Sequence, residues 1–375
     1  MSSPSRGSRA PFYPETPDFD IMRSVHIRNL YVHFPFCRAK CSYCALYSAA
    51  GRPENERNDY AMRLAEDVSR IAAEAPGPLS TVYFGGGSPA LCDLRPLLAA
   101  IEPLLAPDGS TEFTVELHPM DVDGETISIL ADGGVNRISM GVQSLDDAAL
   151  ADMRRGYTAS EARRAFDKVR SRFANAGIDM IVGYPAERAE NVDLSPLASW
   201  GLSHCSLYSL ILEEKSILAT RIRRGASPEP QDDDTVMDAM RRCADTLEGM
   251  GLRRYEIANF ALPGKECRHN MATWLGEDYT GLGTGAYGRE GLLRTYNPPS
   301  GPRDASTLTE EDDLRERTLF RLRTRWGLDA SRFPAWLKTL DSLTDEGLLE
   351  KAGGATYRLT RRGAEVCDSI LAELV

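Results

Sequence analysis

The sequence predicts an α/β fold, in which a partial (β/α)6 TIM-like barrel precedes a smaller C-terminal α+β domain of winged-helix-like type. Short apolar runs alternate with amphipathic stretches up to about residue 225, the pattern of parallel strands covered by helices. Each expected strand ends in small, polar or charged residues, as in barrels that carry their chemistry at the carboxyl ends of the strands. A polar connector rich in Pro and Asp then follows at 225–235.

Six strands and five helices are expected in the barrel. Because six units do not complete a barrel of eight, the expected barrel is open, and the opening suits a large substrate. The expected strands are 30–35, 81–84, 112–117, 137–142, 178–183 and 204–212, and the expected helices are 56–74, 91–105, 124–132, 158–176 and 190–200.

Beyond the connector the pattern changes. A helix is expected at 232–250, a strand-like run at 254–260 and an irregular Gly-rich segment at 263–303. The last seventy residues pattern as helices with a hairpin at 349–359. We therefore expect three regions: a leader rich in Ser, Pro and Arg at 1–25, the barrel at 26–225, and a C-terminal part at 226–375.

Composition narrows the possible functions. The 375 residues carry a formal net charge of −11, which argues against nucleic acid as the partner and favours a packing or substrate-covering role for the winged-helix-like end. No apolar run is long enough for an integral membrane segment. Five of the eight cysteines are scattered without a paired pattern, and the N-terminus lacks the apolar core of a signal peptide. The expected location is the cytoplasm.

Three cysteines follow the first expected strand within eight residues: Cys37, Cys41 and Cys44. Thiolates suit iron–sulfur clusters and zinc, but a structural zinc site needs four ligands and no fourth one lies nearby at matching spacing. A cubane cluster on three thiolates keeps one iron open to a small chelating molecule. The spacing, with Tyr43 before the last Cys, resembles the signature of the radical S-adenosylmethionine superfamily. A partial zinc site remains the alternative.

Other strand ends carry residues suited to ligand binding. The run Gly85–Gly87 lets backbone approach a ligand closely, although a plain tight turn also explains it. Glu116 can accept hydrogen bonds from ribose hydroxyls or an ammonium group, or be a solvated charge. Gln143 and Asp179 have the same placement, and the guanidinium of Arg155 can clamp a carboxylate or simply lie on the surface.

Longer motifs extend the resemblance over residues 28–373. The runs Tyr31-Val-His-Phe-Pro-Phe-Cys37, Glu116-Leu-His-Pro119 and Gly134-Val-Asn-Arg-Ile-Ser-Met-Gly-Val-Gln143 resemble the oxygen-independent coproporphyrinogen III oxidase family, and within it the HemW-type heme chaperones. The resemblance implies that the three cysteines hold a [4Fe-4S] cluster with S-adenosyl-L-methionine on its open iron. It assigns Tyr31, Gly86 and Glu116 to that first molecule, and Tyr43, Gly87, Ser88, Gln143, Arg155 and Asp179 to a second one, whose presence in the chaperones stays open.

Two departures from the oxidases point to heme handling. The oxidases carry a further Cys where this chain has Leu46, and they have a longer N-terminal region. The heme-binding segment of the chaperones resembles the motif His-Asn-x-x-Tyr-Trp. This chain has His269-Asn-Met-Ala-Thr-Trp274, in which Thr273 replaces the Tyr. His269 is expected to ligate heme iron, and Trp274 to pack on the porphyrin. Cys267 and Tyr287 are alternative ligands, and a structural histidine is an alternative for His269.

The resemblance implies a heme chaperone that binds heme and passes it to an unidentified acceptor protein. Such a role is binding and transfer, with no bond cleaved. The alternative is a radical enzyme acting on a tetrapyrrole, either an oxygen-independent coproporphyrinogen III oxidase or a related methyltransferase. In that case the protein would position S-adenosylmethionine against its substrate and exclude side reactions.

Overall fold

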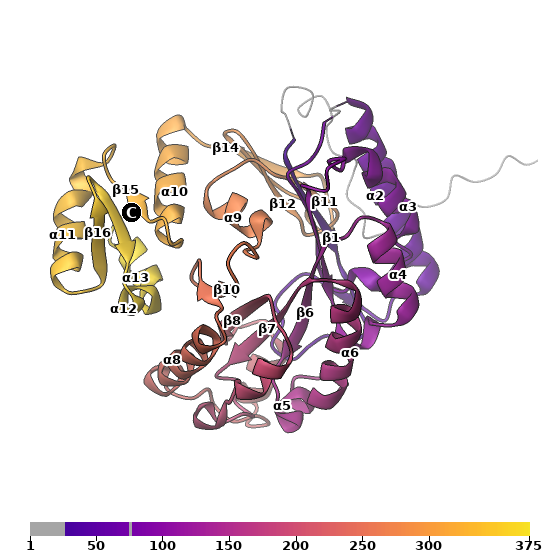
Figure 1. Cartoon of the computed structure of the whole chain (residues 1–375), viewed down its shortest axis with the longest axis horizontal. Helices are drawn as coiled ribbons and strands as arrows, with labels where there is room; N and C mark the ends of the chain where they lie inside the picture. The colour runs from indigo at the N-terminus through magenta and orange to yellow at the C-terminus, as the bar shows by residue number, and fades with distance from the viewer. Residues whose placement is uncertain (1–26, 75–76) are drawn as a thin grey trace, which may run out of the picture.

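The computed structural model describes residues 27–74 and 77–375, so the expected leader at 1–25 lies outside the described residues. One nine-stranded sheet dominates the fold and curves around a polar interior, with its helices on the outside (Figure 1). Its order is β11-β1-β4-β5-β6-β7-β8-β10-β9. The six central strands are parallel, which confirms the partial barrel; they are β1 (Asn29–Phe34), β4 (Thr81–Gly86), β5 (Glu112–Leu117), β6 (Arg137–Gln143), β7 (Asn175–Val182) and β8 (His204–Ser209).

Alternation along each strand separates two faces of the sheet. Val32, Phe84 and Val115 are fully buried within the main hydrophobic core. Residues of the other parity, among them Tyr83 and Glu116, contact one another across the strands. Because strand side chains alternate with a period of two, the interior of the barrel is lined with polar and aromatic groups.

The helices of the barrel agree in part with expectation. α2 (Glu54–Glu74) and α4 (Gly124–Asp132) match closely, and α6 (Ala159–Arg172) begins with a capping box at Thr158. The helix expected at 91–105 is shorter, because Pro96 starts α3 (Arg95–Ile101) and Pro103 falls in the 3-10 turn η2 (Glu102–Leu104). Two short helices were not expected, α5 (Asp147–Asp152) and α7 (Ile217–Arg223).

The prediction of a helix at 190–200 is wrong. The chain forms only the 3-10 turns η4 (Ala189–Asn191) and η5 (Ser195–Ser199) there. The Asp193 carboxylate accepts the backbone N–H of Ser195 at 2.8 Å, and Pro196 follows at once. Such local side-chain bonds compete with α-helical pairing. The strand expected at 204–212 likewise ends early, at Ser209.

The segment expected to be irregular, 263–303, is ordered. It contains α9 (Arg268–Trp274) and the edge strand β11 (Thr280–Leu282), which pairs with β1 in parallel. These elements have three to seven residues, too few for a clear periodicity in the sequence. A small separate sheet follows, made of β12 (Tyr287–Glu290), β13 (Leu293–Tyr296) and β14 (Asp304–Thr307).

The main sheet also extends past the expected boundary at 225. The long helix α8 (Asp233–Gly249), expected at 232–250, is followed by two short edge strands where one strand-like run was expected. β10 (Asn259–Ala261) pairs antiparallel with β8, and β9 (Arg253–Arg254) pairs with β10.

The C-terminal end is winged-helix-like, as the sequence predicts, and has a hydrophobic core of its own that includes Leu322, Leu340 and Tyr357. We propose that the division between the two units lies near residue 308 instead of 225. The end consists of α10 (Glu310–Leu322), β15 (Leu328–Asp329), η6 (Pro334–Trp336), α11 (Leu337–Asp345), the hairpin β16 (Leu349–Gly353) and β17 (Thr356–Leu359), α12 (Arg361–Glu365) and α13 (Cys367–Ala372).

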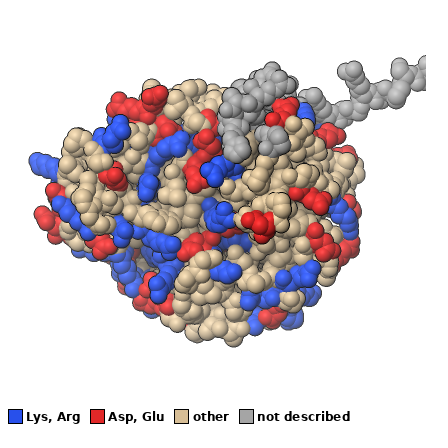
Figure 2. All heavy atoms as spheres, turned by 45° about the horizontal axis from the view of Figure 1, so that its top comes forward, with Lys and Arg blue, Asp and Glu red and all other residues tan. Residues whose placement is uncertain are grey.

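α9 lies between the sheet and α10 (Figure 1). None of the helices in the described residues has the length and apolar character needed to cross a membrane. On the face drawn in Figure 2, acidic and basic side chains are interspersed. Such mixing differs from the single-sign surface that phosphate-backbone binding requires.

Candidate functional site

The three motif cysteines lie in one loop at the carboxyl end of β1. β2 (Phe36–Cys37) pairs in parallel with β3 (Ala49–Ala50), and this pairing closes the loop. The loop is also tied to the glycine turn after β4, because the backbone N–H of Gly87 donates to Phe34 at 2.6 Å and that of Ser88 to Phe36 at 2.7 Å. We call the carboxyl ends of the parallel strands, together with this loop, the barrel mouth.

The environment of the thiols suits soft-metal ligation. Cys37, Cys41 and Cys44 are partly exposed, and all eight cysteines of the chain are free thiols. Burial raises the pKa of Cys37 to about 11 and also raises the pKa of Cys44. A bound metal must therefore displace protons from these groups. Among the described residues, no group of three or more His, Cys, Asp or Glu side chains is arranged to hold one metal ion as it stands.

Arg155 lies beneath the loop and is buried, contrary to the surface alternative. Its Nη1 donates to Cys41 Sγ at 3.2 Å, its Nη2 to the carbonyl oxygen of Gly141 at 2.5 Å, and its Nε to Tyr157 Oη at 2.8 Å. The guanidinium thus joins the cysteine loop to the end of β6 and places a positive charge beside a thiol. Such a charge stabilises thiolates and the anionic cluster that they would hold.

The glycines of the turn after β4 allow neighbouring parts of the chain to pack closely against the turn. Gly86 has φ +103°, and a Cβ there would lie 2.5 Å from Cε1 of His33. A Cβ on Gly87 would lie 2.2 Å from the carbonyl oxygen of Phe36. Neighbouring chain fills the space into which a side chain at either glycine would project, so both positions require glycine for the protein's own packing, and their contact with a ligand stays a prediction. Ser88 Oγ donates to Asp121, which also pairs with Arg38 of the cysteine loop.

Two carboxylates face the interior below the cysteine loop. Glu116 accepts hydrogen bonds from Tyr83 Oη at 2.7 Å and from the backbone N–H of Gly86 at 3.1 Å. Burial and the neighbouring Asp179 raise the pKa of Glu116 to about 7. Burial also raises the pKa of Asp179, which accepts a hydrogen bond from Ser139 Oγ at 3.1 Å. This pair creates a strong demand for a cationic ligand, such as the ammonium or sulfonium of S-adenosylmethionine.

The remaining predicted residues of this site lie around the same interior. Tyr31 Oη is 2.9 Å from His33 Nδ1, and Tyr43 makes an edge contact with the ring of Tyr184. Gln143 stands at a register shift between β6 and β7 with φ 75°, a conformation that costs free energy for a residue with a side chain. Strain of this kind is common at binding sites.

Several residues of this interior were not among those expected from the sequence. His33, Tyr83 and Ser139 contact the predicted residues directly. A usable signal was present. His33 stands two residues after Tyr31 on β1, and Tyr83 and Ser139 lie directly opposite Tyr31 and Glu116 on neighbouring strands, so each faces the same side as a predicted residue.

The residues expected to bind heme do not lie together in one site. His269 begins α9 at the opposite end of the barrel, where its ring contacts those of Tyr31, Tyr83 and Tyr279. Its Nδ1 is 2.8 Å from Thr81 Oγ1, and its backbone N–H donates to Glu112 at 3.1 Å. We call this end, the amino ends of β1, β4 and β5 covered by residues 267–280, the barrel base.

His269 is therefore a structural side chain here, the alternative that the sequence left open. It is only 6% exposed, and burial lowers its pKa to about 3. The rings of Tyr31, Tyr83 and Tyr279 pack around it in this structure, and its assignment as an axial heme ligand stays a prediction. Cys267 is also buried, whereas Tyr287 is 61% exposed and stacks on Tyr296. Trp274 faces away from the base and packs against Phe320.

Fold and site together define a radical S-adenosylmethionine protein. Residues 31–194 match the Radical SAM superfamily. The structure resembles coproporphyrinogen III oxidase (HemN) from Escherichia coli, with a TM-score of 0.80 over 97% of this chain and 94% of that one, at 19% identity. That likeness concerns the fold.

The sequence comparison is more specific. The chain is 30% identical to the heme chaperone HemW of Bacillus subtilis over 93% of this chain and 100% of that protein. It is 33% identical to the heme chaperone HemW of Lactococcus lactis over 81% of this chain and 84% of the relative. The chain therefore belongs to the HemW family of radical S-adenosylmethionine proteins, a family membership that implies a [4Fe-4S] cluster and S-adenosylmethionine.

Proposed function

We propose that this protein is a heme chaperone that binds a [4Fe-4S] cluster, S-adenosylmethionine and heme, and transfers heme to an acceptor protein. The proposal rests chiefly on one observation, the cysteine loop held over a buried pair of carboxylates at the barrel mouth. The names of the HemW relatives supply the heme role. Free thiols throughout the chain agree with a cytoplasmic location, which we include in the proposal.

Each group at the mouth has a definable task. Cys37, Cys41 and Cys44 would ligate the cluster, and Arg155 would hold the loop against β6. Glu116 and Asp179 would orient the positively charged end of S-adenosylmethionine, with Tyr31 and Gly86 beside it. Tyr43, Gly87, Ser88 and Gln143 would lie nearest any second molecule. A cluster held there would be able to donate an electron to the sulfonium, chemistry that heme transfer itself does not need.

Heme binding is tested by titrating the anaerobically reconstituted chain with hemin. The expected result is a saturable Soret band at one heme per chain. Transfer is tested by mixing the heme-loaded chain with an apo b-type cytochrome and following the holo spectrum. Delivery should be faster than from hemin-loaded serum albumin, which releases heme without a dedicated partner. Failure to bind hemin would remove the proposal.

The radical oxidase remains the second candidate, and a turnover assay separates the two. Leu46 stands where the resembled oxidases carry a further Cys, and its side chain is exposed at 56%. Anaerobic incubation with reductant, S-adenosylmethionine and coproporphyrinogen III should therefore yield no protoporphyrinogen IX. Turnover in this assay would favour the oxidase.

A further inference from the structure

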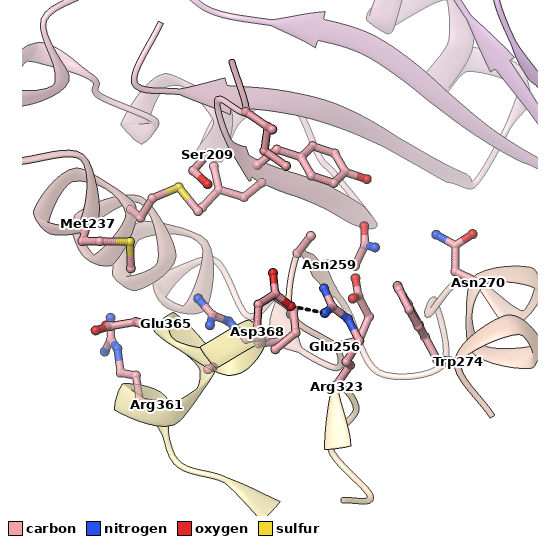
Figure 3. A pocket seen from close by; sticks show the side chains of 18 of the residues that line it. Ser209, Met237, Glu256, Asn259, Asn270, Trp274, Arg323, Arg361, Glu365 and Asp368 are labelled. Atoms are coloured by element: carbon pink, nitrogen blue, oxygen red, sulfur yellow. Dashed lines mark hydrogen bonds and ion pairs between the residues drawn. The ribbon is translucent and has the colours of Figure 1, made fainter. Parts of the chain in front are cut away.

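A cavity of about 510 Å3 lies between the edge of the barrel and the C-terminal unit. Its walls come from the end of β8, from α8, from residues 254–259, from α9, from Arg323 just after α10, and from α12 and α13 (Figure 3). We call it the interdomain cavity. Its volume is within the range of cofactor and ligand sites, about 300–1,000 Å3.

Part of the predicted heme segment lines this cavity. Asn270, Thr273 and Trp274 border it, whereas His269 and Met271 are buried and do not line it. Asn270 lies three and four positions before Thr273 and Trp274, and residues with this spacing share one face of a helix. This face is available to a ligand.

Two thioethers face the cavity from the other side. Met237 and Met240 are three residues apart on α8 and both line it. In Figure 3, Met237 and Trp274 lie on opposite sides of the hollow. Thioether sulfur is a soft ligand that holds heme iron in some proteins, and an indole offers a flat apolar surface to a porphyrin.

Basic side chains complete the cavity. Arg254 makes no ion pair or side-chain hydrogen bond within the described residues, and its guanidinium lies 4.9 Å from the ring centroid of Phe260. Its acidic neighbours are Glu248, Glu256 and Glu365. Arg323 lies 4.8 Å above the ring of Trp274 and pairs with Asp368, whose side chain is 86% exposed. An exposed partner is easily exchanged, because surface ion pairs contribute little free energy. Both arginines are thus suited to carboxylates of a ligand.

Unpartnered polar atoms point to the same conclusion. Glu256 and Asn259 line the cavity and are each 3% exposed. Oε1 of Glu256 and Oδ1 of Asn259 lack a hydrogen-bond partner, although the Ala258 backbone and the Asn259 side chain donate to the Glu256 carboxyl group. Buried polar atoms without partners are costly, by about 1–3 kcal/mol each. Burial raises the pKa of Glu256. Figure 3 places these two residues between Met237 and Trp274.

We propose that the interdomain cavity is the heme site, with the thioether of Met237 or Met240 on the iron, Trp274 along the macrocycle, and Arg254 and Arg323 on the propionates. This inference rests on the proposed function. In it, the heme segment contacts heme through Trp274 and not through His269. It also separates the heme from the cluster ligands at the barrel mouth.

The test is a hemin titration of matched variants of the full chain. Met237→Leu with Met240→Leu should shift the Soret band and weaken hemin binding at least tenfold. Met62→Leu, at a methionine 47% exposed on α2, should change neither. His269→Asn, which can keep a hydrogen bond to Thr81, should leave the spectrum unchanged. Metal-free protoporphyrin IX, followed by fluorescence, should bind the methionine variant normally.

A second pair of variants tests the basic side of the cavity. Arg254→Gln should weaken binding of metal-free protoporphyrin IX about fivefold to tenfold, as for loss of one charged hydrogen bond. Arg164→Gln, at a surface arginine with a side chain 65% exposed, should have no effect.

The outcomes separate the inference from the proposed function. Absence of hemin binding by the wild-type chain would overturn both. Wild-type binding that survives the methionine and Arg254 changes with the same spectrum and affinity would overturn the site alone. If the methionine variant does not fold, the Arg254 comparison decides.

Discussion

The barrel mouth and the interdomain cavity are built in different ways. The mouth takes its three cysteines from a single loop, and its carboxylates from the ends of neighbouring parallel strands. The cavity draws on six separate segments, from β8 to α13, and the sequence around most of its residues gives no sign of their role. The difference shows that one chain can hold a site made by local spacing and a site made only by packing. It also predicts that the two can be impaired independently.

The largest expected effect is at the mouth. Cys41→Ser should abolish cluster assembly, so that iron after anaerobic reconstitution falls from about four atoms per chain to less than one. Hemin binding should persist, because the interdomain cavity does not include the cysteine loop. Iron and sulfide analysis beside a hemin titration provides the measurement, with Cys243→Ser on α8 as a control that keeps its iron. Simultaneous loss of both ligands would contradict two separate sites.

The second largest effect is expected for Arg155, which lies beneath the cysteine loop. Arg155→Leu removes three hydrogen bonds of a buried guanidinium and should lower the free energy of unfolding by about 3–5 kcal/mol. Arg164→Leu on the surface should stay within about 0.5 kcal/mol of the wild type. Urea unfolding of the cluster-free chain measures both. Equal effects from the two substitutions would mean that Arg155 does not anchor the mouth.

A smaller effect is expected at the barrel base. His269→Asn should lower the free energy of unfolding by about 2 kcal/mol, because contacts to three tyrosine rings are lost in a buried position. Thermal unfolding checks this value, and retained hemin affinity in the same variant would sharpen the distinction between base and cavity. A stable variant that no longer binds hemin would restore His269 as a ligand candidate.

The smallest effect concerns pH at the mouth. Since the pKa of Glu116 is about 7 without ligand, its carboxyl is mostly protonated at pH 6 and mostly ionised at pH 8. A cationic ligand binds the ionised form, so S-adenosylmethionine should bind about tenfold more tightly at pH 8 than at pH 6. Equilibrium dialysis of the reconstituted chain measures this difference. Glu116→Gln should remove it, and a slope that survives the substitution would assign the titration to another group.

Much of the mouth was predictable from sequence because its geometry is local. The spacing of Cys37, Cys41 and Cys44 limits them to one loop, and the alternation of a strand determines that Glu116 and Asp179 face the interior. The parallel strands were predictable for the same reason, since their apolar runs face helices on one side. The helix expected at 190–200 failed where one short side chain, Asp193, offered the backbone a competing bond.

The sequence by itself determined the class of the protein, the six parallel strands of the partial barrel and the position of the thiols. Only the tertiary structure decided which residues of α9 meet the barrel and which meet the cavity, and hence that His269 is enclosed while Trp274 lines a ligand-sized space. The physical reason is the separation in sequence of the residues that interact. Periodicity and loop spacing depend on residues a few positions apart, whereas the cavity depends on how the edge of the sheet, α8 and the C-terminal unit pack together across more than a hundred residues.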